Sequence, residues 1–425
     1  MLLKVRRSIP NGNVLIPGSK SHTIRALFFA ALSEGVSVIR EPLVSDDADS
    51  AIKVLKRYGA HITAEEGRYM VKGFGRIPGR PSGEIDTGNS GTTLNFAASM
   101  AALTEHRSIL TGDHQIKRRP VGPLLEALNV LGAKASSLKN NGCPPISIQG
   151  KLHGGHVQIP CVTSQYLSSL LITLPLAEGD STIIPTILNE RPYADMTLWW
   201  LDMLDIRYER KGYSLFHIPG DQKYINFDFT VPGDYSSATF FIVLAAITGG
   251  RIRLMNLKTD DPQGDKEVLD IISKMGAKVK IEKDCIIVEG NGLQGIDIDM
   301  NAVPDALPAF AVMACFSKGR TRLRNVRQAR LKETDRIRVM YEELKKMGAR
   351  IRELEDGLEI ETSDLKGARL NGHGDHRVVM ALSLAGAMCR EQTVIETAEA
   401  VSITFPGYVV LMRDIGMDME LTDDG

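Results

Sequence analysis

The sequence has little of what marks a disulfide framework, a metal site or a membrane span. Its five cysteines are scattered, with no Cys-x-x-Cys pair and no spacing typical of a metal site, which favours free thiols in a reducing compartment. The longest apolar run, ATFFIVLAAI, is far shorter than the roughly 20 residues that cross a bilayer. The opening segment MLLKVRRSIPNGN has charges but no apolar signal region. We therefore expect no disulfides, no zinc and a cytoplasmic location.

A strong charge of one sign is absent as well. The formal net charge is −1, and no patch combines basic with aromatic residues, so the sequence gives no support for binding nucleic acid or an acidic membrane. Any affinity for anions has to come from local clusters. What the chain does have is size, because 425 residues with 43% hydrophobic and 24% charged side chains suffice for two or three domains with large cores.

A repeat runs through the whole chain. A phrase with a leucine, Gly-Ala and alternating apolar residues recurs, as in LKRYGAHITA and LKKMGARIREL, with weaker copies in LDMLDIRYER and MRDIGMDMEL. Its markers, at spacings of 73, 73, 71, 72 and 68 residues, are Gly59, Gly132, Asp205, Gly276, Gly348 and Gly416. Such regular spacing indicates an internal repeat. Each copy is typical of a helix that ends at a glycine-type cap and leads into a pair of strands.

A second helix precedes each of these caps. Six polar or glycine-containing loops open apolar helices, and their markers, at spacings of 70, 75, 70, 72 and 69 residues, are Gly18, Gly88, Thr163, Gly233, Asp305 and Gly374. The chain is therefore predicted to be six copies of one α/β unit. The sixth copy lacks its second strand, which the segment LLKVRR could supply. Grouping three copies per domain gives one domain over residues 21–232 and a discontinuous one made of 1–20 plus 233–425.

The loops that open the apolar helices carry candidate anion-binding residues. Parallel helices would bring their N-termini, with unsatisfied N–H groups and positive dipole ends, to one face, which suits anions. The simpler alternative is capping, because Ser, Thr, Asn and Asp are preferred at any helix start. Capping has no use for cations, so Lys20 with Arg25 and His376 with Arg377 favour binding. The other polar residues of these loops are Ser21, Asn89, Thr163, Ser164, Gln165, Asp234, Asp305 and Asp375.

Two further cation clusters open amphipathic helices. Arg118 and Arg119 precede Pro120 in one, and RLKETDRIRVM opens the other. A charge-rich first turn is often only a solvated face. Lys332 and Arg336 are four residues apart, however, so on a helix they would share a face, where two cations repel unless an anion joins them. Glu333 adds a carboxylate whose protonation could be tuned for acid/base chemistry.

The motifs PGSKS, GNSGTT, RRPVG, TSQY, VPDA, LKETDR, DHR and TFPGY, in this order over nearly the whole chain, resemble those of the enolpyruvyl transferases. The resemblance implies an inside-out α/β barrel of two domains, each with three βαβαββ units. It implies transfer of the enolpyruvyl group of phosphoenolpyruvate to the 5-hydroxyl of shikimate 3-phosphate, by a monomer that needs no metal or organic cofactor. A sister enzyme that acts on a UDP-sugar usually has a cysteine where this chain has His114, so that acceptor is disfavoured.

The resemblance also assigns roles to residues. Lys20 matches a lysine shared by both substrates. Residues matching the acceptor site are Ser21 and Arg25 for the carboxylate, and Thr163, Ser164, Gln165 and Tyr193 for the phosphate and ring. Arg119, Arg336 and Arg377 match a clamp on phosphoenolpyruvate, whose carboxylate and phosphate suit the guanidinium fork. Further substrate-binding positions implied by the motifs are Asn89, Gly91, Asp234, Asp305, Gln328 and Lys332.

The proton-transfer residues implied by the resemblance are Asp305, Glu333, Lys332, Lys20 and His376. Our hypothesis places Asp305 beside the acceptor's hydroxyl and Glu333 at C3 of the donor. Lys20 and Lys332 would then neutralise the charge that develops in the reaction.

Four positions depart from the family's pattern: Asn95 replaces an arginine, Gln328 an asparagine at the acceptor, Glu190 a serine at the acceptor's phosphate, and Ile403 a lysine at the phosphoenolpyruvate site. A carboxylate beside a phosphate would repel it. Either Glu190 turns outward, for example toward Arg191, or the acceptor differs. Ile403 predicts weakened inhibition by phosphonate mimics of phosphoenolpyruvate such as glyphosate.

Two alternatives stay open at this point. One is an enolpyruvyl transferase with another hydroxylated acceptor, and the other is a binding homologue without turnover. The intact set of Lys20, Arg25, Asp305, Glu333 and the His376–Arg377 pair argues against the second. A nucleic-acid enzyme of related architecture finds no support in the charge of the chain.

Overall fold

The computed structural model describes residues 1–423, which form two compact units. One unit, which we call the split unit, combines residues 1–19 with the chain from Pro232 onward; the other, the continuous unit, comprises residues 20–231. The two segments at which the chain crosses from one unit to the other, near residues 19 and 232, lie next to each other on the split unit. There Gly18 and Gly233 form an antiparallel bridge, and the Ser19 amide donates to the Pro232 carbonyl at 2.8 Å.

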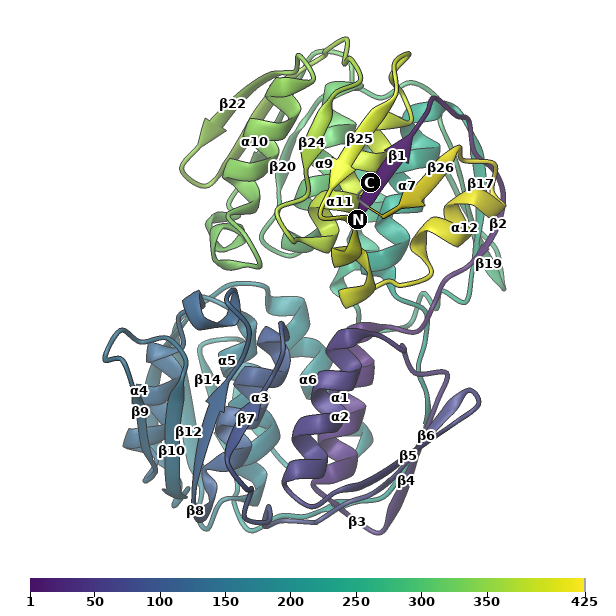
Figure 1. The fold of residues 1–425 in the computed structure, drawn as a ribbon. Helices are drawn as coiled ribbons and strands as arrows, with labels where there is room; N and C mark the ends of the chain where they lie inside the picture. Colours follow the sequence, from purple (N-terminus) through teal and green to yellow (C-terminus); the bar gives the residue numbers. More distant parts are fainter. Residues whose placement is uncertain (424–425) are drawn as a thin grey trace. The chain divides into compact units, whose positions relative to one another are not determined.

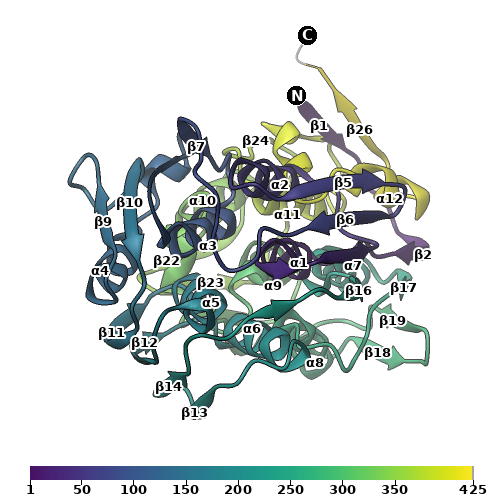
Figure 2. The ribbon, with the colours of Figure 1, turned by 90° about the horizontal axis from the view of Figure 1, so that it is seen from below.

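The continuous unit holds three copies of one four-stranded mixed sheet with two helices, arranged around α1, α3 and α5 (Figure 2). The first copy consists of α1 (Lys20–Ala31), β4 (Val36–Arg40), α2 (Asp46–Arg57), β5 (His61–Glu65) and β6 (Arg68–Lys72), and its outer strand is β16 (Asp228–Thr230). The second consists of β7 (Glu84–Asp86), α3 (Gly91–Ala101), β8 (Leu103–Thr111), α4 (Gly122–Val130), β9 (Lys134–Ser137) and β10 (Ile146–Lys151). The third consists of β11 (Gly155–Cys161), α5 (Ser164–Thr173), β12 (Ser181–Leu188), α6 (Arg191–Met203), β13 (Glu209–Lys211) and β14 (Leu215–Ile218). A small sheet joins β3 (Ser33–Glu34) to β15 (Tyr224–Ile225).

The split unit repeats the same plan. Its first copy consists of β2 (Asn11–Leu15), α7 (Tyr235–Thr248), β17 (Arg251–Met255), α8 (Glu267–Met275), β18 (Lys278–Ile281) and β19 (Cys285–Glu289). The next consists of β20 (Asp297–Asp299), α9 (Leu307–Cys315), β21 (Arg320–Arg324), α10 (Arg336–Lys346), β22 (Arg350–Leu354) and β23 (Gly357–Glu361). The last consists of β24 (Arg369–Asn371), α11 (His376–Gly386), β25 (Thr393–Glu396), α12 (Tyr408–Asp414) and β26 (Met419–Thr422). The described chain also has short 3-10 helices at Ile116–Arg118, Leu174–Leu176, Gly264–Lys266, Pro304–Ala306, Arg327–Leu331 and Ala398–Ile403.

The last copy takes its missing strand from the start of the chain. Strand β1 (Leu2–Val5) lies between β25 and β26 and pairs antiparallel with both, as Figure 1 shows. Strand β2 follows directly and pairs in parallel with β17. The prediction that LLKVRR completes the sixth copy is therefore confirmed, and so is the α/β class with six repeated βαβαββ units.

The caps that marked the repeat all adopt the left-handed conformation. The five glycine markers have φ between 92° and 113°, and Asp205 has φ of 54°. Glycine adopts this conformation without the steric penalty of a Cβ atom, and Asp is among the few residues that tolerate it. Each amphipathic helix therefore ends at a fixed place, and the chain turns there into its strand pair.

The other six helices, α1, α3, α5, α7, α9 and α11, are buried nearly all round. In α7 every residue from Tyr235 to Ala246 is buried, as a helix that is apolar on all faces requires. Within each unit the three buried helices contact one another and the sheets pack outside them. Their first turns consequently hold the polar residues that the core cannot accept. Among residues 1–423, no helix is long and apolar enough to span a bilayer.

Candidate active site

In the split unit, three carboxylates surround one buried arginine. Arg336 is the first residue of α10, and its side chain is 1% exposed. Its Nε donates to Asp375 Oδ2 at 2.8 Å, its Nη1 to Asp305 Oδ1 at 2.9 Å and its Nη2 to Glu333 Oε2 at 2.6 Å. Burial alone would lower the pKa of Arg336, but the charges of Asp375, Glu333 and Asp305 outweigh burial and raise it. The positive charge is therefore secure, and its hydrogen bonds orient all three carboxylates.

Asp305 also joins two further cations. Its Oδ2 lies 3.0 Å from Arg377 Nη2, and its Oδ1 lies 3.9 Å from Lys332 Nζ. One prediction was wrong here: Lys332 and Arg336 do not share a helix face. Asp335 caps α10 by accepting from the Arg338 amide at 3.0 Å, so the helix begins only at Arg336 and Lys332 lies before it in an extended conformation. The anion expected between the two cations is the carboxylate of Asp305.

Capping accounts for two of the predicted acidic residues. Asp375 caps α11, where its Oδ1 accepts from the Arg377 amide at 2.9 Å while its carboxylate also binds Arg336. Asp234 caps α7, where its Oδ2 accepts from the amide and the hydroxyl of Ser237 at 3.2 and 2.6 Å. Capping is thus sufficient for Asp234, whereas Asp375 both caps a helix and compensates a charge.

The remaining predicted residues of the split unit lie near the same helix starts or in the short helices before them. His376 is the first residue of α11 and is buried. Gln328 is 5% exposed, and its Nε2 is buried without a hydrogen-bond partner among the described residues. Ile403, at the position of an expected lysine, packs its half-buried side chain against the core of the split unit. Among residues 1–423, Gln328 therefore has a buried donor without a protein acceptor, and Ile403 has an apolar packing role.

In the continuous unit, the first two turns of α1 hold two cations of different kinds, Lys20 and Arg25. Lys20 Nζ lies 3.2 Å from Asp47 Oδ2 of α2, and both side chains are largely buried. Arg25 is 3% exposed, and burial lowers its pKa to about 10, with a smaller opposing effect of Tyr193. The two cations thus differ in that Lys20 has a carboxylate partner.

The hydrogen bonds of Arg25 go to neutral oxygens. Its Nε donates to Thr197 Oγ1 at 2.9 Å, its Nη1 to the Ser21 carbonyl at 3.1 Å, and its Nη2 to the Tyr193 carbonyl at 2.9 Å and Ser168 Oγ at 3.4 Å. These contacts fix the guanidinium but do not neutralise it. A buried cation with neutral partners favours an incoming anion.

At the start of α3, Asn89 and Gly91 frame the side chain of Arg119. Arg119 Nη2 donates to Asn89 Oδ1 at 3.3 Å, and Asn89 Nδ2 donates in turn to Asp113 Oδ2 and Gln115 Oε1 at 2.5 and 2.6 Å. A Cβ atom added to Gly91 would lie 2.4 Å from Arg119 Nη1. A larger residue at position 91 would therefore force the Arg119 guanidinium to move from this place.

Helices α3 and α5 are tied together at their first turns through Gln165. Its Nε2 donates to Thr92 Oγ1 at 3.2 Å, and its Oε1 accepts from Asn95 Nδ2 at 2.8 Å. Asn95 Nδ2 also donates to the Gly91 carbonyl at 2.9 Å. Asn95, at the position of an expected arginine, thus positions Gln165 instead of contributing a cation.

The side chain of Glu190 turns inward onto the start of α5. Its Oε2 accepts from Thr163 Oγ1 at 3.0 Å, from Ser164 Oγ at 3.0 Å and from the Ser164 amide at 3.2 Å. The residue is 1% exposed. Of the two alternatives for Glu190, the outward orientation, for example toward Arg191, is therefore wrong. The physical reason is that the helix start offers an anion three donors, which outweigh one exposed cation.

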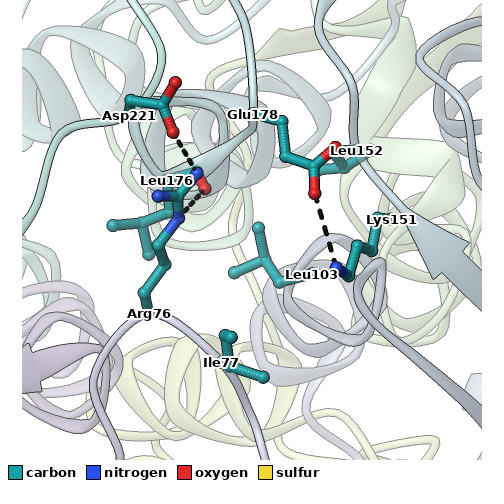
Figure 3. Close-up of a pocket in the computed structure, with 8 residues that line it drawn as sticks. All are labelled: Arg76, Ile77, Leu103, Lys151, Leu152, Leu176, Glu178 and Asp221. Carbon is teal, nitrogen blue, oxygen red and sulfur yellow. Dashed lines mark hydrogen bonds and ion pairs between the residues drawn. The ribbon is translucent and has the colours of Figure 1, made fainter.

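A separate cavity of about 260 Å³ lies in the continuous unit near the ends of α3 and α5 (Figure 3). Leu103 and Leu176, which line it, follow the last turns of these helices. The charges in it are paired, because Arg76 contacts Asp221 at 2.5 Å and Lys151 contacts Glu178 at 3.4 Å. The cavity is therefore a poor candidate for binding substrate anions, which favour the helix starts.

Several residues of these clusters have no signal of their own in the sequence. Thr197 and Ser168, which hold Arg25, are ordinary neutral residues within helices. Asp47 lies in an acidic first turn of a kind common to many helices, so nothing in the sequence marks it as the partner of Lys20. Its position would follow only from the packing of α1 against α2. The motifs therefore do not reveal partners that come from other elements.

Comparison with known proteins accounts for the pattern of these clusters. Residues 7–412 match the model of the family described as EPSP synthase (3-phosphoshikimate 1-carboxyvinyltransferase). The chain belongs to the EPSP synthase family.

Relatives of high identity cover nearly the whole chain. A 3-phosphoshikimate 1-carboxyvinyltransferase of Acetivibrio thermocellus is 58% identical over 419 residues, which is 99% of each chain. One of Ruminiclostridium cellulolyticum is 52% identical over 99% of this chain and 100% of its own. A solved EPSP synthase of Acinetobacter baumannii superposes with a TM-score of 0.83 at 27% identity, covering 99% of this chain and 100% of that one. The resemblance inferred from the motifs is confirmed.

Proposed function

We propose that this protein transfers the enolpyruvyl group of phosphoenolpyruvate to the 5-hydroxyl of shikimate 3-phosphate and releases phosphate. The observation that carries the proposal is the 58% and 52% identity, over essentially the whole chain, to two proteins named 3-phosphoshikimate 1-carboxyvinyltransferase. The clusters of cations and carboxylates at the helix starts of both units support it. We also propose that the protein is a monomer and that it acts in the cytoplasm; the five free cysteines are in keeping with the second of these.

The reaction is an addition followed by an elimination, and protons move in both steps. The acceptor's 5-oxygen forms a bond to C2 of phosphoenolpyruvate and loses its proton, while C3 gains a proton. The tetrahedral intermediate then loses phosphate from C2 and a proton from C3, which restores the double bond. Groups that bind two anionic substrates and exchange protons are therefore needed, and no oxidant or reductant takes part.

We assign the acceptor to residues whose donors are already oriented. The charge of Arg25, held by neutral oxygens, suits the acceptor's carboxylate, with Ser21 beside it. The buried Nε2 of Gln328 is a donor for one of the acceptor's oxygens. Gln165, positioned by Asn95 and Thr92, would contact the ring. The remaining acceptor residues in this proposal are Lys20, Thr163, Ser164, Tyr193 and Asp234.

We assign phosphoenolpyruvate to the arginines at the helix starts, Arg119, Arg336 and Arg377. Each guanidinium is held by a protein oxygen, Arg119 by Asn89 and the other two by Asp305. Asn89 and Gly91 therefore act by positioning Arg119. Binding of the donor would exchange some of these internal bonds for bonds to its carboxylate and phosphate.

Proton transfer falls to the carboxylates around Arg336 in this proposal. Asp305 takes the proton of the acceptor's hydroxyl, and Glu333 delivers a proton to C3 and later removes one. Both carboxylates are fixed by hydrogen bonds to Arg336, which is the positioning that general acid/base catalysis needs. Lys332, which lies 3.9 Å from Asp305, and Lys20 offset the developing charge, and His376 completes the group at the start of α11.

Phosphate release by the purified protein tests the proposal. We expect release from phosphoenolpyruvate only when shikimate 3-phosphate is also present, at a rate proportional to the enzyme concentration. Omitting each substrate in turn is the control. Binding of phosphoenolpyruvate without turnover of shikimate 3-phosphate would contradict the proposed acceptor and would direct the search to other hydroxylated anions.

A further inference from the structure

The start of α5 is a complete anion site that the protein itself fills. Three donors, Thr163 Oγ1, Ser164 Oγ and the Ser164 amide, converge within 3.0–3.2 Å on one oxygen of Glu190. The positive end of the helix dipole adds to their effect. With the carboxylate 1% exposed, this arrangement is a buried charge-assisted contact and not a solvated side chain.

Glu190 reaches this site from outside α5. It follows β12 and is the residue before α6, with φ of 56° and ψ of 42°. Its side chain makes no capping hydrogen bond to α6 among the described residues, although that helix starts at the next position. The carboxylate is therefore directed at a neighbouring helix and not at its own.

A phosphate and this carboxylate cannot use the same three donors at once. Two negative groups brought that close also repel strongly in a buried site. Under the proposed function, Thr163 and Ser164 hold the phosphate of the acceptor. An acceptor with a phosphate must then displace Glu190, whereas an acceptor without one leaves Glu190 in place.

We infer that Glu190 is a specificity-determining residue that acts as an internal competitor for the phosphate of the acceptor. The inference rests on the proposed function. It predicts that Glu190 weakens binding of shikimate 3-phosphate but not of shikimate, so the chain discriminates less between the two acceptors than it would with a neutral residue at position 190. Binding of phosphoenolpyruvate is expected to be independent of Glu190.

Glu190→Ser removes the competitor and keeps a hydroxyl at this position. We expect binding of shikimate 3-phosphate, measured by isothermal titration calorimetry, to tighten about tenfold or more, since like-charge contacts in an interface cost several kcal/mol. The preference for shikimate 3-phosphate over shikimate should rise by the same factor, with the KM for phosphoenolpyruvate changed less than about twofold. A purely structural role would weaken both acceptors together.

Asp195→Asn is the matched control, because it removes a negative charge from α6 where Asp195 contacts Arg210 and Tyr213 instead of α5. We expect no change in acceptor preference for this variant. Glu190→Gln, which keeps the shape and one acceptor oxygen but removes the charge, should give an intermediate result. Unchanged or weaker binding of shikimate 3-phosphate in both Glu190 variants would overturn the inference.

Two measurements separate this inference from the proposed function. A structure of the unmodified protein with shikimate 3-phosphate should show the Glu190 carboxylate beyond hydrogen-bond distance of Thr163 and Ser164; retention of these contacts would overturn the inference even if the variants fail to fold. Binding of inorganic phosphate should likewise be tighter in Glu190→Ser. Tighter phosphate binding without any turnover of shikimate 3-phosphate would support the competitor role while contradicting the proposed function.

Discussion

Each unit buries an arginine, but the two arginines have opposite kinds of hydrogen-bond partner. Arg25 in the continuous unit donates to four neutral oxygens, and burial lowers its pKa to about 10. Arg336 in the split unit is as deeply buried, but Asp375, Glu333 and Asp305 compensate it and raise its pKa. The charge of Arg25 therefore stays available for a substrate anion. The charge of Arg336 mainly orients the carboxylates that we assign to proton transfer.

The comparison extends to the anions that the helix starts already hold. Glu190 lies at the start of α5, and Asp375 at the start of α11. Asp375 contacts Arg336 as well, so its charge is balanced within the protein. Glu190 accepts from two hydroxyls and one amide at the start of α5. Removing the Asp375 carboxylate would take one of three carboxylates away from the buried Arg336, so we expect a substrate anion to displace Glu190 more readily than Asp375.

Replacing each arginine by methionine should give the largest difference between the units. Arg336→Met removes the buried cation that contacts three carboxylates and should destabilise the split unit by about 3–5 kcal/mol. Arg25→Met removes bonds to neutral partners and should destabilise the continuous unit by roughly 1–3 kcal/mol. Hydrogen exchange in urea, read separately in α10 and α1, measures both. Arg338→Met, which loses exposed pairs with Glu342 and Glu353, is the control and should cost under about 1 kcal/mol.

The pH dependence of these losses has a definite sign. The carboxylates around position 336 repel one another once the cation is gone, so the loss of stability in Arg336→Met should be greater at neutral than at acid pH. Arg25→Met leaves only neutral oxygens, so its loss should stay nearly constant between about pH 4 and 7. Equal pH profiles for the two variants would contradict the contrast between the arginines.

Removing a proton-transfer carboxylate should come next in size. Asp305→Ala and Glu333→Ala are each expected to lower kcat by about 100-fold or more, because a positioned general acid or base contributes that much. Initial-rate measurements with both substrates saturating would show it. Glu342→Gln, which changes an exposed carboxylate on α10, should keep normal turnover. Near-normal turnover in either alanine variant would refute the role of that residue.

A methyl group at residue 91 should have a smaller and more selective effect. Gly91→Ala places its Cβ against Arg119 Nη1, so the guanidinium has to move, and the KM for phosphoenolpyruvate should rise about tenfold. Binding of shikimate 3-phosphate alone should change little. Gly122→Ala, whose Cβ would lie 3.8 Å from its nearest neighbour, Gly142 Cα, is the control. An unchanged donor KM in Gly91→Ala would remove Arg119 from the donor site.

The repeat, the helix caps and the closing strand β1 were all predictable because they depend on local preferences that recur six times. The sequence also identified the clusters at the helix starts. It failed at Lys332, where the cap at Asp335 moved the helix start by one turn, and at Glu190, whose direction depends on donors contributed by α5. Such outcomes are decided by long-range contacts between elements, which no local pattern encodes.

Ile403 gives the smallest expected effect and tests the split unit alone. Ile403→Lys would restore a cation whose stem can lie along the apolar surface that now packs the isoleucine. A cation at a half-buried position that water still reaches adds little, so the KM for phosphoenolpyruvate should fall about threefold and inhibition by glyphosate should tighten by a similar factor. Ile403→Met, which keeps an apolar side chain, should leave both unchanged. If glyphosate already inhibits the unmodified protein strongly, Arg119, Arg336 and Arg377 supply enough positive charge for phosphonate binding. Arg336 would then bind the ligand despite its contacts with three carboxylates, and the contrast between Arg336 and Arg25 would be smaller than proposed.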